Sequence, residues 1–219
     1  MINRQTYRDH VIEHVCTLLR QGLLKPGDKV YEAHLALDLG VSRAPVREAM
    51  RHLVGEGLLE YRPQIGSFVA DLSPQEIIDS YVTRGLLEGF AIAESAVTLP
   101  AAQMRELEQL CDLMEKSAAS GDDACLIDAG ARYHRLLYSR SSNRQLLKHI
   151  EQLSNKLHLL FYRHWARFYT PDEIRARHLD LLETVGGGSK SLIESAFRQH
   201  YLETGRKVAA LYQDKETDL

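Results

Sequence analysis

The sequence has little cysteine and no long hydrophobic run, and both absences exclude classes of protein. Its 219 residues include three cysteines, Cys16, Cys111 and Cys125, which are far apart and form no CxxC pair. A disulfide-stabilised scaffold is therefore not expected, and a reducing cytoplasm is the expected compartment. No apolar segment approaches the roughly 18 residues that span a bilayer, and the N-terminus lacks the apolar stretch of a signal peptide.

The sequence also lacks a strong charge of either sign. The net charge is −3, with nine basic and nine acidic residues among residues 1–71 and 18 and 21 in the remainder. Because nucleic-acid-binding domains are often basic, composition alone argues mildly against such a function. The hydrophobic fraction of 44% and the charged fraction of 26% are typical of a globular protein, and the length suits one or two domains.

A helix-start signal at Ser73, Pro74 and Glu76 divides the chain. Ser73 can cap the helix, Pro74 suits its first position, and Glu76 completes a capping box. We therefore expect two domains, residues 1–72 and residues 73–219. The expected fold is mostly α, with an N-terminal winged helix-turn-helix that includes a small β-hairpin, and a C-terminal all-α bundle of six helices.

In the first domain, apolar spacing predicts helices over residues 6–21, 32–39 and 42–54. Gly40 ends the second helix and Ser42 begins the third, which gives the tight turn of a helix-turn-helix. After this turn, residues 58–61 and 67–70 are expected to pair as a hairpin across residues 62–66.

The third predicted helix carries two different faces. Val46, Ala49, Met50 and Leu53 form an apolar stripe, and Arg43, Arg47 and Arg51 recur every four residues away from it. Arginines near a helix N-terminus oppose the helix dipole, and a bound phosphate would relieve this conflict. The alternative is a solvated charged face in which Glu48 pairs with Arg47 or Arg51.

These residues resemble the DNA-binding domain of GntR-type bacterial transcriptional regulators. The resemblance covers residues 7–71 and rests on GLLKPGD at 22–28, LALDLGVSRAPVREAM at 35–50, LVGEGLL at 53–59 and GSFV at 66–69. It implies a dimeric regulator that binds a double-stranded DNA operator. The resemblance matches some of these positions to DNA contacts, and the arginine row and the polar group at the wing tip add the others. The candidate DNA-binding residues are Ser42, Arg43, Arg47, Arg51, Gln64 and Gly66. Many relatives have a basic residue where this chain has Ile65.

The second half is expected to form helices over residues 74–97, 101–119, 122–140, 143–168, 171–186 and 189–214. Three histidines, His134, His178 and His200, lie on apolar stripes of different predicted helices. Imidazole in an apolar bundle needs a hydrogen-bond partner or a metal. Each histidine taken singly suits a hydrogen-bonded core position, whereas the three together can also form a site for a divalent metal such as zinc.

This half resembles the FCD effector domain of the FadR branch of GntR-type regulators, and its six helices resemble the VanR-like subgroup. The motifs are RGLLE at 84–88, YHRLL at 133–137, RHLDLL at 177–182, and His200. In metal-binding relatives an aspartate four residues before the first histidine joins the three histidines, and here that position is Gly130. Asp128 is expected to point elsewhere. The resemblance implies an effector pocket lined by His134, His178, His200 and Arg84.

Three functions remain open at this stage. The first is a homodimeric transcription factor whose operator affinity responds to a small organic acid, held with or without a metal. The second is a DNA-binding regulator whose C-terminal bundle only dimerises. The third is a metal-dependent enzyme that uses the three histidines, although the sequence shows no general base, nucleophile pair or phosphate-binding loop for it.

Overall fold

The computed structural model describes residues 6–95, 99–161 and 168–213. The chain forms two compact units, residues 1–72 with 155–160 and residues 73–154 with 161–219. Within the described ranges, no helix combines the length and the apolar character needed to cross a membrane.

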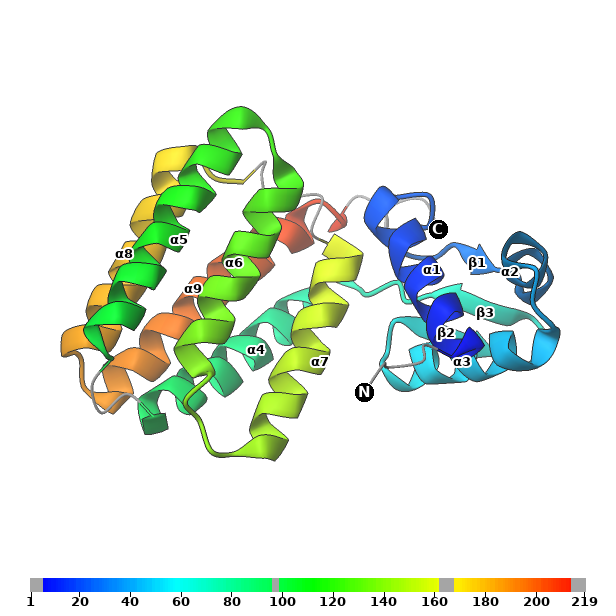
Figure 1. Ribbon diagram of the computed structural model, residues 1–219, viewed down its shortest axis with the longest axis horizontal. Coiled ribbons are helices and arrows are strands. Elements are labelled where there is room, and N and C mark those ends of the chain that lie inside the picture. Colours follow the sequence, from blue (N-terminus) through cyan, green and yellow to red (C-terminus); the bar gives the residue numbers. More distant parts are fainter. Residues whose placement is uncertain (1–5, 96–98, 162–167, 214–219) are drawn as a thin grey trace. The chain divides into compact units, whose positions relative to one another are not determined.

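The first unit is a winged helix-turn-helix, which confirms the predicted fold (Figure 1). Val46, Ala49, Met50 and Leu53 are buried, so the apolar stripe of the third helix packs inward as expected. Gly40 adopts a left-handed conformation, with φ of 62°, that ends the second helix and allows the tight turn before the third. The elements are α1 (Tyr7–Gln21), β1 (Lys29–Val30), α2 (Glu32–Leu39), α3 (Arg43–Gly55), β2 (Leu59–Arg62) and β3 (Gly66–Val69).

The sheet differs from the expected hairpin in two ways. Strand β3 lies between β2 and a further antiparallel strand, β1. Strand β1 has only two residues, which is too few to show the alternation of apolar and polar residues that predicts a strand. Arg62 pairs with Gly66, so the loop contains only residues 63–65. Gln64 has a φ of 64° and Gly66 a φ of 119°, and these left-handed conformations allow the tighter turn.

Residues 73–213 form six helices in their described part, as predicted. Two capping boxes begin helices where expected: Glu76 donates its backbone N–H to Ser73, and Glu173 donates its own to Thr170. The expected helix ends at 97 and 214, and residues 162–167, lie outside the described residues. The helices are α4 (Pro74–Ser95), α5 (Ala101–Ser120), α6 (Asp123–Tyr138), α7 (Arg144–Phe161), α8 (Pro171–Gly187) and α9 (Lys190–Ala210).

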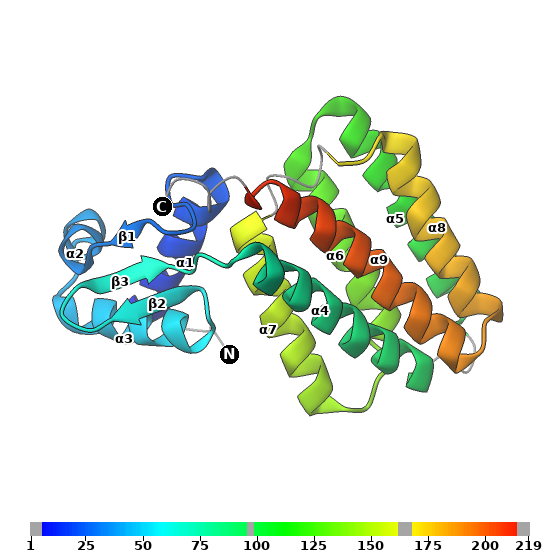
Figure 2. The same ribbon diagram turned by 180° about the vertical axis from the view of Figure 1, so that it is seen from behind.

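Helices α4 and α9 lie side by side, as Figure 2 shows from behind, and α5 packs against both α6 and α8. Glycines bring the backbones of α4 and α9 unusually close. A Cβ atom at Gly85 would lie 2.8 Å from the carbonyl oxygen of Phe197, and one at Gly205 would lie 2.8 Å from Cβ of Tyr81. Close packing at this interface therefore requires glycine at both positions.

We predict that Gly85→Ala lowers the free energy of unfolding by about 1–3 kcal/mol, because the added methyl group forces two helix backbones apart. Gly186→Ala in α8 is the control. No described atom lies within 4 Å of its added Cβ, so the change should be neutral or slightly stabilising. Urea unfolding of the full chain measures both effects, and equal values for the two variants would contradict the close α4–α9 contact.

Candidate functional site

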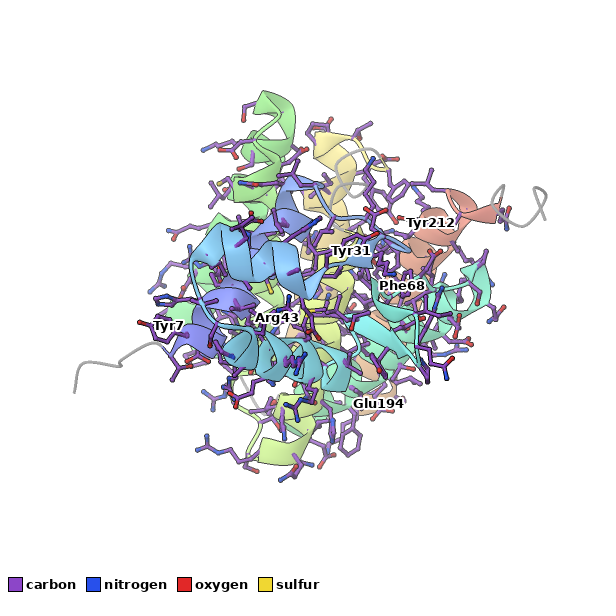
Figure 3. The ribbon with its side chains drawn as sticks, turned by 90° about the vertical axis from the view of Figure 1, so that its right-hand side faces the viewer. Tyr7, Tyr31, Arg43, Phe68, Glu194 and Tyr212 are labelled. Atoms are coloured by element: carbon purple, nitrogen blue, oxygen red, sulfur yellow. The ribbon has the colours of Figure 1, made fainter. Side chains whose placement is uncertain are left out.

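The exposed face of α3 presents the three predicted arginines. Arg43, Arg47 and Arg51 are all exposed, and Figure 3 labels Arg43 on this helix. Ser42 occupies the N-cap position, but within the described part of the chain its hydroxyl makes no capping hydrogen bond. The first turn of α3 has no acidic residue. The helix start therefore combines backbone N–H groups, a hydroxyl and positive side chains, which together suit a phosphate.

Arg47 is paired across the helix-turn-helix. Its Nε lies 3.1 Å from Oε2 of Glu32 at the start of α2, so Glu32 takes the place that the sequence offered to Glu48. Arg51 in turn donates to the carbonyl oxygen of Arg47. Both side chains of the Arg47–Glu32 pair are exposed, so the pair adds little stability. It does orient the guanidinium, and a bound anion would have to compete with the Glu32 carboxylate for Arg47.

The wing tip carries Gln64, which is exposed, and Gly66, which is partly exposed. Lys29, from β1, lies beside Gly66: a Cβ atom at Gly66 would be 3.3 Å from the Cε atom of Lys29. Arg62 stacks over the ring of Phe68, with 4.4 Å from Cζ to the ring centroid (Figure 3 labels Phe68). A basic side chain therefore borders the wing tip although position 65 is isoleucine. The sequence analysis missed Lys29 because it did not predict β1.

The three predicted histidines meet in the helical bundle. His134 comes from α6, His178 from α8 and His200 from α9, and their ring centroids are 5.3–5.6 Å apart. One ring nitrogen of each lies within 4.8 Å of those of the other two. His134 is buried, and His178 and His200 are partly exposed. The spacing is suitable for three ligands of one metal ion.

The second nitrogen of each ring has a nearby group. His178 donates from Nδ1 to the carbonyl oxygen of Ile174 at 2.6 Å, since a carbonyl can only accept. Nδ1 of His134 lies 3.0 Å from Oε2 of Glu88, although outside the angular range of a hydrogen bond. In these two rings Nε2 is left for a ligand. Nδ1 of His200 instead lies 3.5 Å from Nη2 of Arg177.

Glu88 is a buried carboxylate that the sequence analysis did not select. Arg84 donates from Nε to Oε1 at 2.8 Å, and Tyr201 donates from its hydroxyl to Oε2 at 2.8 Å. Glu88 is 0% exposed and Arg84 is 2% exposed. Burial raises the pKa of Glu88, but Arg84 and His134 outweigh it and lower the pKa to about 2. A signal was present in the sequence, since Glu88 lies one turn from Arg84 on the apolar face of α4.

Burial also sets the protonation of the histidines. It lowers the pKa of His178 to about 3, assisted by His134. The pKa of His200 is well below its usual range because of burial and the neighbouring His178 and His134. Neutral imidazole at pH 7 is the form that binds metal ions.

The donor set fits a divalent metal through three nitrogens and no directly placed carboxylate. At Gly130, an added Cβ would lie 3.5 Å from Sδ of Met114, an ordinary contact. Asp128 is exposed, as expected from its place on the helix. Three protein ligands with one open position are typical of zinc sites that bind a further ligand.

Arg177 is a second residue that the sequence analysis missed. It forms an ion pair with Glu203 and donates from Nη2 to the carbonyl oxygen of His200 at 3.2 Å. Arg177 also lines a cavity of about 340 Å³ between α8 and α9, together with Glu203 and Tyr169. This cation therefore links an open cavity to the histidine cluster.

We predict that metal-free protein loses stability as the pH falls from 7 to 5. With a folded pKa of about 3 against an ordinary value near 6.5, His178 binds fewer protons when folded across this window. Acidification therefore favours the unfolded chain, by about 1–2 kcal/mol at pH 5, because partial exposure of the ring reduces the full effect.

Urea unfolding of chelator-treated protein measures this dependence. His178→Gln should reduce this dependence but not abolish it, because His200 also has a lowered pKa. His149→Gln, at an exposed position of α7, should behave as the wild type. An unchanged slope in His178→Gln would show that this ring is not held neutral by the fold.

Comparisons with known proteins agree with both halves of the structure. Residues 79–203 match the FCD domain, and residues 7–69 match the family described as "Bacterial regulatory proteins, gntR family". The chain is 28% identical to the HTH-type transcriptional regulator YdhC of Bacillus subtilis, over 84% of this chain and 81% of that protein. It is also 28% identical to a "Probable D-xylose utilization operon transcriptional repressor" of Paenarthrobacter nicotinovorans, over 91% and 87%.

A solved structure, E. coli McbR/YncC, has the same fold, with a TM-score of 0.69, 24% identity, and coverage of 96% of this chain and 99% of that one. The FCD match spans more than half of the chain, and the matched families and curated relatives are transcriptional regulators and not enzymes. The chain therefore belongs to the GntR family of bacterial regulators, carries an FCD domain, and is a DNA-binding transcriptional regulator.

Proposed function

We propose that the chain binds a near-palindromic operator as a homodimer, and that a small carboxylate bound in the helical domain changes its affinity for DNA. Residues 1–72 bind DNA, residues 73–219 bind the effector and dimerise, and the regulator acts in the cytoplasm as a VanR-like member of the FadR branch. The observation that carries this proposal is the exposed arginine row of α3, which starts beside Ser42, whose hydroxyl makes no capping hydrogen bond within the described residues.

In this proposal α3 lies in the major groove. Arg47 contacts a guanine edge, where a bidentate guanidinium gives base discrimination, while Ser42, Arg43 and Arg51 contact phosphates. Gln64 and Gly66 approach the minor groove at the wing, and Lys29 supplies the positive charge that Ile65 does not. Two copies related by two-fold symmetry bind two half-sites, because one winged helix covers only a few base pairs.

The effector site in this proposal is the histidine cluster. Nη2 of Arg177 donates to the carbonyl oxygen of His200 and lies 3.5 Å from its Nδ1, so a positive charge borders the cluster and favours an anion. Arg84 is fully buried with Glu88, whereas Arg177 and its partner Glu203 are partly exposed and line the open cavity. We therefore assign to Arg177 a share of the carboxylate recognition that the sequence assigned to Arg84 alone. Effector binding then shifts the population of DNA-binding conformations.

A divalent metal such as zinc would be held by the three histidines, His134, His178 and His200. When bound, it supplies a positive centre that a carboxylate effector can ligate. His134 and His178 each leave Nε2 for this role, and the neutral state of His178 and His200 at pH 7 supports it. Metal and acid would then bind cooperatively, each raising the affinity of the other by the same factor.

We predict that Arg47→Ala weakens specific operator binding by about 1–3 kcal/mol and broadens sequence preference. Arg43→Ala should weaken specific and non-specific binding alike and reduce the salt slope by about one. The operator is first selected from random duplex DNA, and fluorescence anisotropy at several salt concentrations then gives affinity and the number of protomers bound.

The matched control is Arg20→Ala, which removes an exposed arginine of α1 that pairs with Glu13. Glu32→Gln should increase non-specific affinity, since it removes the carboxylate that competes with DNA for Arg47. Wild-type affinity in both the Arg47 and Arg43 variants, or one protomer per operator, would contradict the proposed binding mode.

We predict that small organic acids raise the melting temperature of chelator-treated protein more strongly when zinc is present. A thermal-shift panel of dicarboxylates and aromatic acids tests this, with D-xylose included because one relative is a repressor of D-xylose utilization. His134→Ala and His178→Ala should abolish the shift, whereas the exposed His149→Ala should keep it.

Stabilisation by acids that zinc does not change would show that the histidines bind the anion directly. If no acid stabilises the wild type with or without zinc, the helical domain acts as a dimerisation bundle and the effector proposal is wrong.

A further inference from the structure

The histidine cluster lacks the negative charge that a divalent metal usually receives from its ligands. Its three imidazoles supply no negative charge, position 130 is glycine, and Asp128 is exposed. Carboxylate near a metal site stabilises the ion either by direct ligation or through a histidine ligand. A buried carboxylate beside one of the three rings can therefore supply negative charge through that histidine.

Glu88 is that carboxylate, and its two oxygens have different partners. Oε1 accepts from Nε of Arg84 at 2.8 Å, which compensates the buried charge. Oε2 accepts from the Tyr201 hydroxyl at 2.8 Å and lies 3.0 Å from Nδ1 of His134. A small rotation of the imidazole would align its Nδ1 proton with Oε2.

We infer that Glu88 is a positioning residue for the metal: it accepts the Nδ1 proton of His134 and so keeps Nε2 of that ring available and basic. This inference rests on the proposed metal site. Because Arg84 balances the net charge, Glu88 acts locally on His134 and does not coordinate the ion. Carboxylate–histidine–metal arrangements of this kind fix both the tautomer and the orientation of the ligand ring.

His134 differs from the other two rings in the group that lies near its Nδ1 atom. His178 donates its Nδ1 proton to a backbone carbonyl, which fixes the same tautomer with a neutral acceptor. At His200 the group near Nδ1 is the Arg177 guanidinium, a donor that withdraws electron density from the ring. Of the three imidazoles, the one beside a carboxylate is the strongest electron donor to a metal.

The first test measures zinc affinity of the full-length, chelator-treated protein by competition with a chromophoric chelator. Glu88→Gln should lower affinity by about 10- to 100-fold, the range found for partners of metal-bound histidines. Because this change leaves Arg84 buried without its carboxylate, the double variant Arg84→Gln/Glu88→Gln is measured beside it. The double variant should lose metal affinity to a similar extent although it buries no net charge.

Three further substitutions separate this role from a purely structural one. Tyr201→Phe removes a hydrogen bond to Oε2 but keeps the carboxylate, and should leave zinc affinity equal or higher. Gly130→Asp adds a direct carboxylate ligand and should restore affinity in the Glu88→Gln background, whereas Gly130→Asn should not.

The tautomer of His134 gives a readout that needs no metal. Nitrogen NMR of the imidazole rings should show His134 protonated at Nδ1 in the wild type and a mixed population in the double variant. Protonation of His134 at Nε2 in the wild type, or equal zinc affinity in the wild type and the double variant, would contradict the inferred role of Glu88. Neither result would contradict the proposed metal site. A wild-type protein that binds neither zinc nor cobalt overturns both this inference and the proposed metal site.

Discussion

The close contact between α4 and α9 is the constraint on which the helical domain depends. Glycines at 85, 89 and 205 remove the side chains that would keep these helices apart, and the neighbouring atoms are backbone atoms or the Cβ and Cγ atoms next to the backbone. This contact brings Tyr201 of α9 within hydrogen-bond distance of Glu88 on α4, and His134 of α6 approaches the same carboxylate. One packing feature thus sets the geometry of the polar groups that surround the histidine cluster.

The polar groups placed by this contact are poorly suited to increasing stability. The desolvation penalty of burying Arg84 and Glu88 can exceed the free energy of their attraction. An apolar pair of similar volume would often be as stable. The pair does, however, join three helices through a single carboxylate. This unfavourable burial is better explained by the proposed role of Glu88 in metal binding than by a role in folding.

Features set by neighbouring residues could be predicted from the sequence, and features set by distant residues could not. The capping boxes at Ser73 and Thr170 and the buried stripe from Val46 to Leu53 are local, and the structure confirms them. Strand β1 was missed because two residues show no alternation, and Lys29 was missed with it. The histidines were visible as polar residues on apolar faces. Glu88 was hidden in a motif, because its partners His134 and Tyr201 lie 46 and 113 residues away along the chain.

The DNA-binding unit shows why net charge was a poor guide to function. Its charges balance over residues 1–71, yet the arginines on α3 share one exposed face, and Arg47 pairs with the carboxylate of Glu32 from α2. Long-range attraction to any DNA is therefore weak, and affinity depends on contacts that only the correct groove geometry supplies. In the proposed binding mode Arg47 exchanges Glu32 for a base edge, and it gains least from a wrong sequence because a single phosphate only replaces the carboxylate that it loses. A neutral domain with this paired arginine would thus favour discrimination between sites over strength of binding.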